Sequence, residues 1–151
     1  MEVIDTDNIS KLKQKIKDLK KQNKKIIVLS QDETFNKKVL ELKEVDILIL
    51  RNLEKSPKFK KHIYSGLNES LCKLAAKNNI LIGFNLIEIS QLDNYKKAFV
   101  LMQLMQNIEL CKKNKTKICI LDSGNYSNLD KLSFFISLGA SSFQAKQACF
   151  K

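Results

Sequence analysis

The stretch that decides the fold is KHIYSGLNESLCKLAAKNNILIGFNL, residues 61–86. It begins with a basic segment that ends in Ser-Gly, continues with apolar residues at helical spacing over about 67–77, and ends in a short apolar run. A loop, a helix and a buried strand that follow one another directly are typical of proteins built from βα units.

The same alternation extends in both directions along the chain. Short branched apolar runs predict strands at 3–4, 26–30, 46–50, 80–84 and 118–121. Helical spacing predicts helices at 9–22, from Asp32 onward, and at 67–77, 94–112, 129–138 and 142–150. Continuous apolar strands alternating with helices indicate an α/β fold with a parallel sheet. The length of 151 residues predicts one domain, 1–151.

The spacing also predicts which helical residues face the core. In the first helix the inward residues are Leu12, Ile16 and Leu19, and the lysines around them form a basic outer face. In the long helix the predicted inward residues are Ala98, Leu101, Met105 and Ile108.

The chain is strongly basic, with 27 Lys and Arg against 16 Asp and Glu and a net charge of +11. Such a surface attracts polyanions, of which nucleic acid is the most frequent. Only one of these basic residues is arginine, so an AT-rich genome is an alternative source of the lysines. A membrane-surface role for the basic helix lacks the aromatic or bulky apolar anchors that such helices use.

Four cysteines stand at 72, 111, 119 and 149 in apolar surroundings, without a Cys-x-x-Cys pair. The N-terminal residues are polar, and the longest apolar runs are too short to span a bilayer. These features predict a cytoplasmic protein with buried free thiols.

Several kinds of catalysis are excluded. The single histidine, His62, does not allow a His-based metal cluster. The chain has no Gly-x-Ser-x-Gly elbow, no phosphate-binding P-loop and no Gly-x-Gly-x-x-Gly fingerprint. The Asp122-Ser123-Gly124 segment fits a nucleophile or, more simply, a turn with exposed amides. We therefore expect no catalytic residue, metal or cofactor.

Anion binding remains. The loop after the third predicted strand carries Arg51, Lys55, Lys58, Lys60, Lys61 and His62, and leads to Ser65-Gly66 at a helix N-terminus. Backbone N–H groups at such a terminus favour phosphate, and Phe59 or Tyr64 can stack on a base. The alternative is a solvated basic loop.

With these residues in view, SGLNESLCKLAAKNNILIGFNL resembles the central signature of the protein component 3 family of archaeal ribonuclease P, related to the eukaryotic p30 subunit. The segments NYKKAFVLMQLMQNIELCKKNKTKICILDSG and LDKLSFFISLGASSFQAKQA are similar to the helices and strand that follow in the family. The resemblance covers the region 26–151, and the strand and basic helix at 1–25 are divergent.

The resemblance implies a TIM-barrel-like (PHP-like) fold without the metal site of phosphoesterase barrels. It implies an RNA-binding, non-catalytic subunit that supports the catalytic RNA of ribonuclease P in removing 5′ leaders from precursor tRNA, together with a smaller protein subunit. About five strands cannot close an eight-stranded barrel. We therefore expect a partial barrel whose open side is covered by the N-terminal helix, by a second copy or by a partner protein.

The residues from the loop and from the family positions together form the predicted RNA-binding set. Glu69 and Asp122 depart from the family pattern, where a His and a Ser are common, and this argues against phosphate contact at those two positions. The set consists of Arg51, Lys55, Lys58, Lys60, Lys61, His62, Ser65, Gly66, Asn68, Lys77, Lys97, Ser123, Gly124 and Lys146.

Two other functions stay open from the sequence. One is a degenerate hydrolase of the phosphoesterase-barrel type, which requires a metal site. The other is a basic interaction or scaffold protein whose charge reflects genome composition.

Overall fold

The computed structural model describes residues 2–51, 65–121 and 124–149. Its strands are β1 (Val3–Ile4), β2 (Ile27–Leu29), β3 (Ile47–Ile49), β4 (Leu81–Phe84) and β5 (Ile118–Ile120). Its helices are α1 (Ile9–Lys21), α2 (Glu33–Glu41), α3 (Glu69–Lys77), α4 (Leu86–Ser90), α5 (Asn94–Lys113), α6 (Asn128–Ser137) and α7 (Ser142–Cys149). The predicted α/β fold is confirmed.

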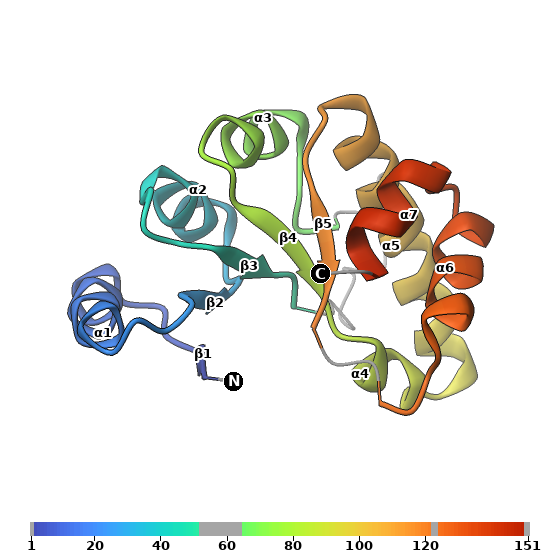
Figure 1. Cartoon of the computed structure of the whole chain (residues 1–151), viewed down its shortest axis with the longest axis horizontal. Helices are drawn as coiled ribbons and strands as arrows, with labels where there is room; N and C mark the ends of the chain where they lie inside the picture. Colours follow the sequence, from blue (N-terminus) through green and yellow to red (C-terminus); the bar gives the residue numbers. More distant parts are fainter. Residues whose placement is uncertain (1, 52–64, 122–123, 150–151) are drawn as a thin grey trace.

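The five strands form one parallel sheet in the order β1-β2-β3-β4-β5, so every strand pairs with its neighbours in the chain. Figure 1 shows the sheet as an arc, with α1, α2 and α3 along its outer side and α5, α6 and α7 beside β5. A sheet curved in this way with helices on its outer side is consistent with the predicted partial, TIM-barrel-like fold.

The two faces of the sheet are covered differently because successive strand residues point to opposite sides. On the outer face, Val28, Leu48, Ile82 and Ile118 belong to the main core formed with the helices. On the inner face a smaller apolar cluster contains Ile27, Ile47, Ile49 and Cys119.

Gly83 allows the inner face to pack closely. A Cβ atom at this position would lie 2.7 Å from Leu121 Cδ1 and 3.0 Å from Ile47 Cγ2. Side chains from β3 and from the end of β5 therefore approach each other over the glycine of β4.

Helix α1 lies on the outer side of the arc (Figure 1). Its predicted inward residues Leu12, Ile16 and Leu19 are buried and belong to the main core. The side chain of Asn8 caps this helix by accepting from the backbone N–H groups of Ser10 and Lys11. Of the three expected covers for the open side, the N-terminal helix is ruled out, because its apolar stripe packs on the outer face.

Two features of the helices differ from the sequence-based expectation. Helix α4 was not predicted; Asn85 caps it by accepting from the N–H groups of Ile87 and Glu88. In α5 the predicted inward residues Ala98 and Met105 are exposed. The buried residues of α5 are Val100, Gln103, Leu104, Asn107, Ile108 and Cys111.

The cysteine prediction is confirmed for three positions. Cys72, Cys111 and Cys119 are buried free thiols, and Cys149 is half-buried. Across the described residues, every helix is too short or too polar to cross a membrane.

Candidate nucleic-acid interface

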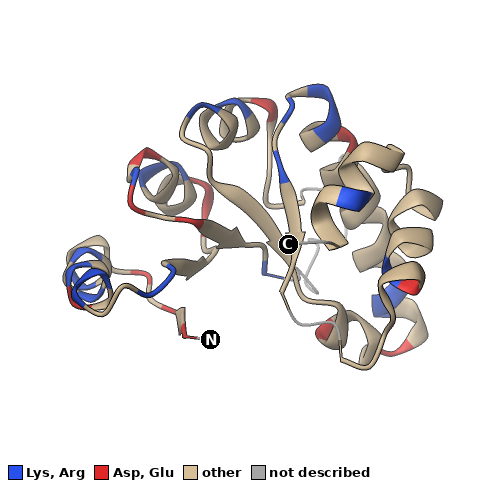
Figure 2. Cartoon of the chain, viewed as in Figure 1, with Lys and Arg blue, Asp and Glu red and all other residues tan. Residues whose placement is uncertain are grey.

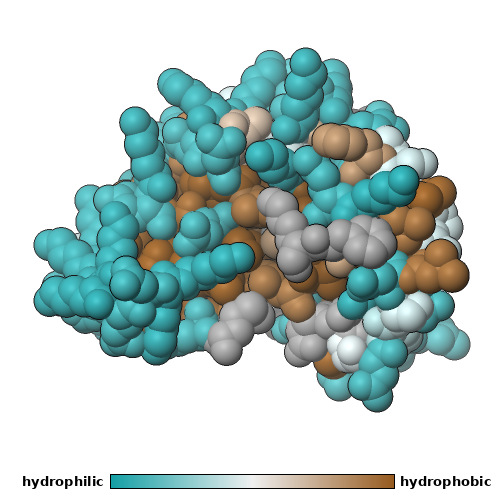
Figure 3. Space-filling model, viewed as in Figure 1, coloured by the Kyte–Doolittle hydropathy of each residue, from teal (hydrophilic) through white to brown (hydrophobic). Residues whose placement is uncertain are grey.

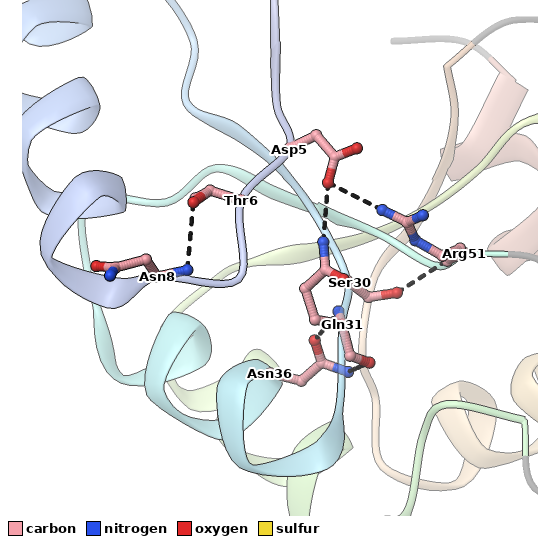
Figure 4. Close-up of polar contacts among 7 residues, drawn as sticks. All are labelled: Asp5, Thr6, Asn8, Ser30, Gln31, Asn36 and Arg51. Atoms are coloured by element: carbon pink, nitrogen blue, oxygen red, sulfur yellow. Dashed lines mark hydrogen bonds and ion pairs between the residues drawn. The ribbon is translucent and has the colours of Figure 1, made fainter.

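Polar side chains meet where β1, β2 and β3 end (Figure 4). Asp5 follows β1, Ser30 and Gln31 follow β2, and Arg51 follows β3. The guanidinium of Arg51 donates to Asp5 Oδ1 at 2.9 Å, and Gln31 Nε2 donates to the same oxygen at 2.9 Å. The backbone N–H of Arg51 donates to Ser30 Oγ at 2.8 Å. Three successive strand ends are thus connected through one carboxylate and one hydroxyl.

Helix α2 holds the backbone of Gln31 through hydrogen bonds made by Asn36. The buried side chain of Asn36 accepts from the backbone N–H of Gln31 at 2.9 Å and donates to its carbonyl oxygen at 3.2 Å. Arg51 is held in place and keeps 46% of its side-chain surface accessible. A planar guanidinium that is fixed and half-exposed still has donors for a phosphate, although Asp5 offsets part of its charge.

Ser65 lies close to Arg51. Both residues line a small cavity of about 20 Å³, together with Phe84, Gln103 and Asn107. Asn107 Nδ2 donates to the backbone carbonyl of Ser65 at 3.0 Å in a buried contact. The described end of the basic loop is therefore anchored to α5.

Lys97 lies in a larger groove next to this cavity. The groove has a volume of about 410 Å³ and lies between α4, α5 and α6. Its lining residues are Leu86, Ile89, Ser90, Lys97, Leu101, Tyr126, Asp130, Lys131 and Phe134. Ile89 lines both spaces, so the groove adjoins the Arg51–Ser65 cavity.

Three of the predicted site residues shape the backbone. Gly66 has a φ of 83° and Gly124 a φ of 56°, both in the left-handed region that favours glycine. Asn68 caps α3 by accepting from the N–H of Leu71, and its amide donates to Glu33 Oε1 at 2.7 Å. The Ser65-Gly66 turn, which was predicted to expose backbone N–H groups, is therefore shaped by the left-handed Gly66 and by the Asn68 cap that follows it.

The structure does not bring all the predicted residues together. Lys77 is exposed in the last turn of α3, next to the amino end of β4, whereas the cluster lies at the carboxyl ends of the strands. Lys146 is exposed on α7. The remaining predicted residues lie outside the described residues: Lys55, Lys58, Lys60, Lys61, His62 and Ser123.

Several residues of this region were missed by sequence reasoning. Asp5 is 46 positions from Arg51 and follows a strand of two residues, so no local pattern marked it as a partner. Tyr126 and Lys131 follow the last strand, and their position after a strand end was a usable signal.

Glu69, the residue that departs from the family pattern, is part of an ion-pair cluster. Its carboxylate lies 2.8 Å from Lys73 Nζ and 3.6 Å from Lys113 Nζ. The hydrogen bond from Lys73 and the positive charge of Lys113 lower the pKa of Glu69. The carboxylate therefore links α3 to α5 and is not directed toward an anion.

Carboxylates elsewhere in the described structure do not converge. No group of three or more His, Cys, Asp or Glu among the described residues has the arrangement of a metal site. Asp130, at the groove, accepts from the Oγ and the backbone N–H of Ser127, and these bonds lower its pKa.

The fold and its polar edge define a barrel-like α/β protein with an open parallel sheet, whose candidate site lies at the carboxyl ends of the strands. No protein-family model matches the chain. Ribonuclease P protein component 3 of Methanococcus vannielii is 28% identical over 120 residues, which are 80% of this chain and 49% of the relative. The corresponding protein of Methanococcus maripaludis is 25% identical over 122 residues, 81% of this chain and 50% of the relative.

Solved structures were also found to be similar. A chain in the cryo-EM structure of archaeal ribonuclease P with mature tRNA superposes with a TM-score of 0.77 at 25% identity, covering 96% of this chain and 62% of that chain. A crystal structure of an uncharacterized protein shares the fold, with a TM-score of 0.59 at 10% identity over 91% of this chain and 34% of that chain. The resemblance to ribonuclease P protein component 3 is confirmed, and the chain spans about half the length of the curated relatives it matches.

Proposed function

We propose that this protein is an RNA-binding accessory subunit of ribonuclease P that supports the catalytic RNA in removing 5′ leaders from precursor tRNA. The observation that carries the proposal is the similarity to component 3 proteins over 80% of the chain, together with the TM-score of 0.77 to a chain of an archaeal ribonuclease P structure. The net charge of +11 supports it, because a polyanionic partner is attracted by such a surface.

The proposed RNA contact is the carboxyl edge of the sheet. There Arg51 is fixed by Asp5, and Lys97 lies in a groove beside Tyr126. Lysines bind phosphate as point charges, and an exposed aromatic ring can stack on an unpaired base. The lysines of the 52–64 segment, Ser123 and the separate Lys77 and Lys146 complete the proposed set.

The proposed partners are the ribonuclease P RNA, precursor tRNA and a smaller protein subunit of the same enzyme, in the cytoplasm. The chain acts in this proposal as one βα domain without catalytic residues of its own. A homodimer is an alternative arrangement of the open sheet.

The test is recovery of the RNA from the native cell. The chromosomally tagged protein is purified under native conditions, with a matched purification of an unrelated tagged protein of similar pI as control. We expect the catalytic RNA to be enriched over ribosomal RNA only with the tagged chain. Equal recovery in both purifications would support a scaffold whose charge is compositional.

A second experiment tests the proposed contact of the 52–64 lysines with RNA. The triple variant Lys58→Gln, Lys60→Gln, Lys61→Gln is expected to weaken binding of the catalytic RNA or to slow cleavage of precursor tRNA in the reconstituted enzyme. Unchanged binding and cleavage would remove the 52–64 segment from the RNA contact.

A further inference from the structure

Helix α1 carries an excess of positive charge that does not belong to the carboxyl edge. Within Ile9–Lys21 there are six lysines, and Asp18 is the one carboxylate. Figure 2 shows blue segments on each turn of α1, at the opposite end of the molecule from α6 and α7.

Three of these lysines form a row. Lys13, Lys17 and Lys21 follow one another at four-residue intervals, so they lie on one side of the helix about 6 Å apart along its axis. All three are exposed. We call them the α1 lysine row. None of the three forms an ion pair with a described residue, whereas the flanking Lys20 and Lys24 pair with Glu44 and Glu2 at 3.8 and 3.5 Å.

The lysines of α5 provide a contrast. Lys96, Lys112 and Lys113 lie 3.6, 2.7 and 3.6 Å from the carboxylates of Asp93, Glu109 and Glu69. Three of the four lysines of α5 thus lie beside acids, whereas the three of the α1 lysine row do not, and a lysine-rich composition alone does not explain this difference. The α1 lysine row is therefore a local concentration of positive charge.

The form of the helix favours nucleic acid over a membrane. Leu12, Ile16 and Leu19 are 0%, 5% and 4% exposed, so the apolar stripe is fully used in packing against the sheet and α2. A helix that binds a bilayer surface needs an apolar face free to enter the interface. Regularly spaced ammonium groups on a rigid helix with no apolar residue among them suit a phosphate backbone. Figure 3 shows hydrophilic side chains over this end of the molecule.

We propose that the α1 lysine row is a second RNA-contact surface, which binds the phosphate backbone of the ribonuclease P RNA independently of base sequence. The proposal rests on the proposed function for the identity of the RNA. Two contact surfaces, one on α1 and one at the carboxyl edge of the sheet, would fix the orientation of the protein on the RNA, which one cluster of point charges does not do.

The experiment measures the affinity of the full chain for transcribed ribonuclease P RNA across a salt series. The test variant is Lys13→Gln, Lys17→Gln, Lys21→Gln. The matched control is Lys37→Gln, Lys38→Gln, Lys43→Gln, which removes the same three charges from exposed positions on and after α2. The charge-retaining variant Lys13→Arg, Lys17→Arg, Lys21→Arg tests whether a loss of affinity follows from charge or from disturbed folding.

We expect the slope of log K against log salt to fall by about one for each lysine that contacts a phosphate, hence by about three in the test variant. Affinity near 0.1 M salt should fall by about tenfold or more. The control variant should stay within about threefold of the wild type, and the arginine variant should match the wild type.

Each other outcome is decisive. Equal losses in the glutamine test and control variants would reduce the effect to net charge and overturn the proposal. Normal affinity in the test variant would overturn it and leave the proposed function intact. Binding of phosphatidylserine-containing vesicles that is lost in the test variant while RNA affinity is unchanged would assign the row to a membrane. A wild-type chain that does not select the catalytic RNA over an unrelated transcript would contradict the proposed function itself.

Discussion

Helices α1 and α5 differ in the kinds of side chain that they bury. In α1 every buried residue is aliphatic, and the rest of the helix is hydrophilic apart from the half-buried Ile9. In α5 the buried face includes Gln103 and Asn107, while Met102 and Met105 are 51% and 47% exposed. Helix α1 is therefore held in the core by apolar contacts alone, whereas α5 also forms a buried hydrogen bond through Asn107.

This difference shows why spacing predicted the buried face of α1 correctly and that of α5 only in part, with Ile108 buried and Ala98 and Met105 exposed. Burying an amide costs free energy, which hydrogen bonds inside the protein offset where they replace those made with water. Asn107 finds such a partner in the backbone carbonyl of Ser65, 42 residues earlier in the chain. A partner at that distance leaves no trace in the local apolar pattern.

The largest expected effect separates two residues of α5 that the spacing predicted to face inward, of which only Ile108 is buried. Ile108 is fully buried, so Ile108→Ala should lower the free energy of unfolding by about 2–5 kcal/mol. Met105→Ala removes a half-exposed side chain and should change it by about 0.5 kcal/mol or less. Urea unfolding followed by circular dichroism measures both. Comparable losses in the two variants would place Met105 in the core.

A smaller effect tests the polar part of the same face. Asn107→Ala leaves the buried carbonyl of Ser65 without its donor and should cost about 1–3 kcal/mol in the free energy of unfolding. Gln106→Ala is the control, because Gln106 is exposed on the adjacent position and alanine is a better helix former. If the two variants unfolded at the same urea concentration, the Asn107 bond would contribute nothing to stability.

The smallest effect concerns the paired charges that distinguish α5 from α1. Glu69 has a lowered pKa in the folded protein, so its ion pairs with Lys73 and Lys113 stabilise the protein above the carboxyl's unfolded pKa. That contribution is lost as the pH falls through the lowered folded value. Glu69→Gln should therefore reduce Tm slightly at pH 7 and not at all in strong acid. High salt should also narrow the difference, since the group is exposed.

Glu41→Gln is the matched control for this comparison. Glu41 ends α2 and forms no ion pair with a described residue, and a carboxylate at a helix C-terminus is unfavourable. We expect this variant to keep or slightly raise Tm at pH 7. A pH-independent loss in Glu69→Gln would show that the side chain acts by packing or capping instead of by charge.

Much of the fold was predictable because it depends on local pattern. The five strands were each marked by a continuous apolar run, and α1 by the four-residue spacing of Leu12 and Ile16. Helix α4 was missed although a usable signal was present: Asn85 caps it, and Glu88 stands three residues later, the spacing of a capping box.

The candidate site was predictable only as a region. Parallel topology placed it at the carboxyl ends of the strands, and Arg51, Ser65 and Lys97 do lie around one pair of adjoining spaces. Arg51 and Ser65 are held there by Asp5 and Asn107, which come close to them only when the sheet has formed. Lys77 lies outside the cluster because α3 runs back toward the amino ends of the strands.

The sequential order of the strands has a consequence for local stability. Strand β1 consists of two residues and pairs only with β2. Opening the β1–α1 unit therefore breaks its pairing with β2, the packing of α1 and the Asp5–Arg51 ion pair, but no strand pairing among β3, β4 and β5. Amide hydrogens of Ile9–Lys21 should exchange at a lower opening free energy than those of β4. RNA bound to the α1 lysine row would slow exchange in this unit first, because a ligand stabilises the closed form of the segment it contacts.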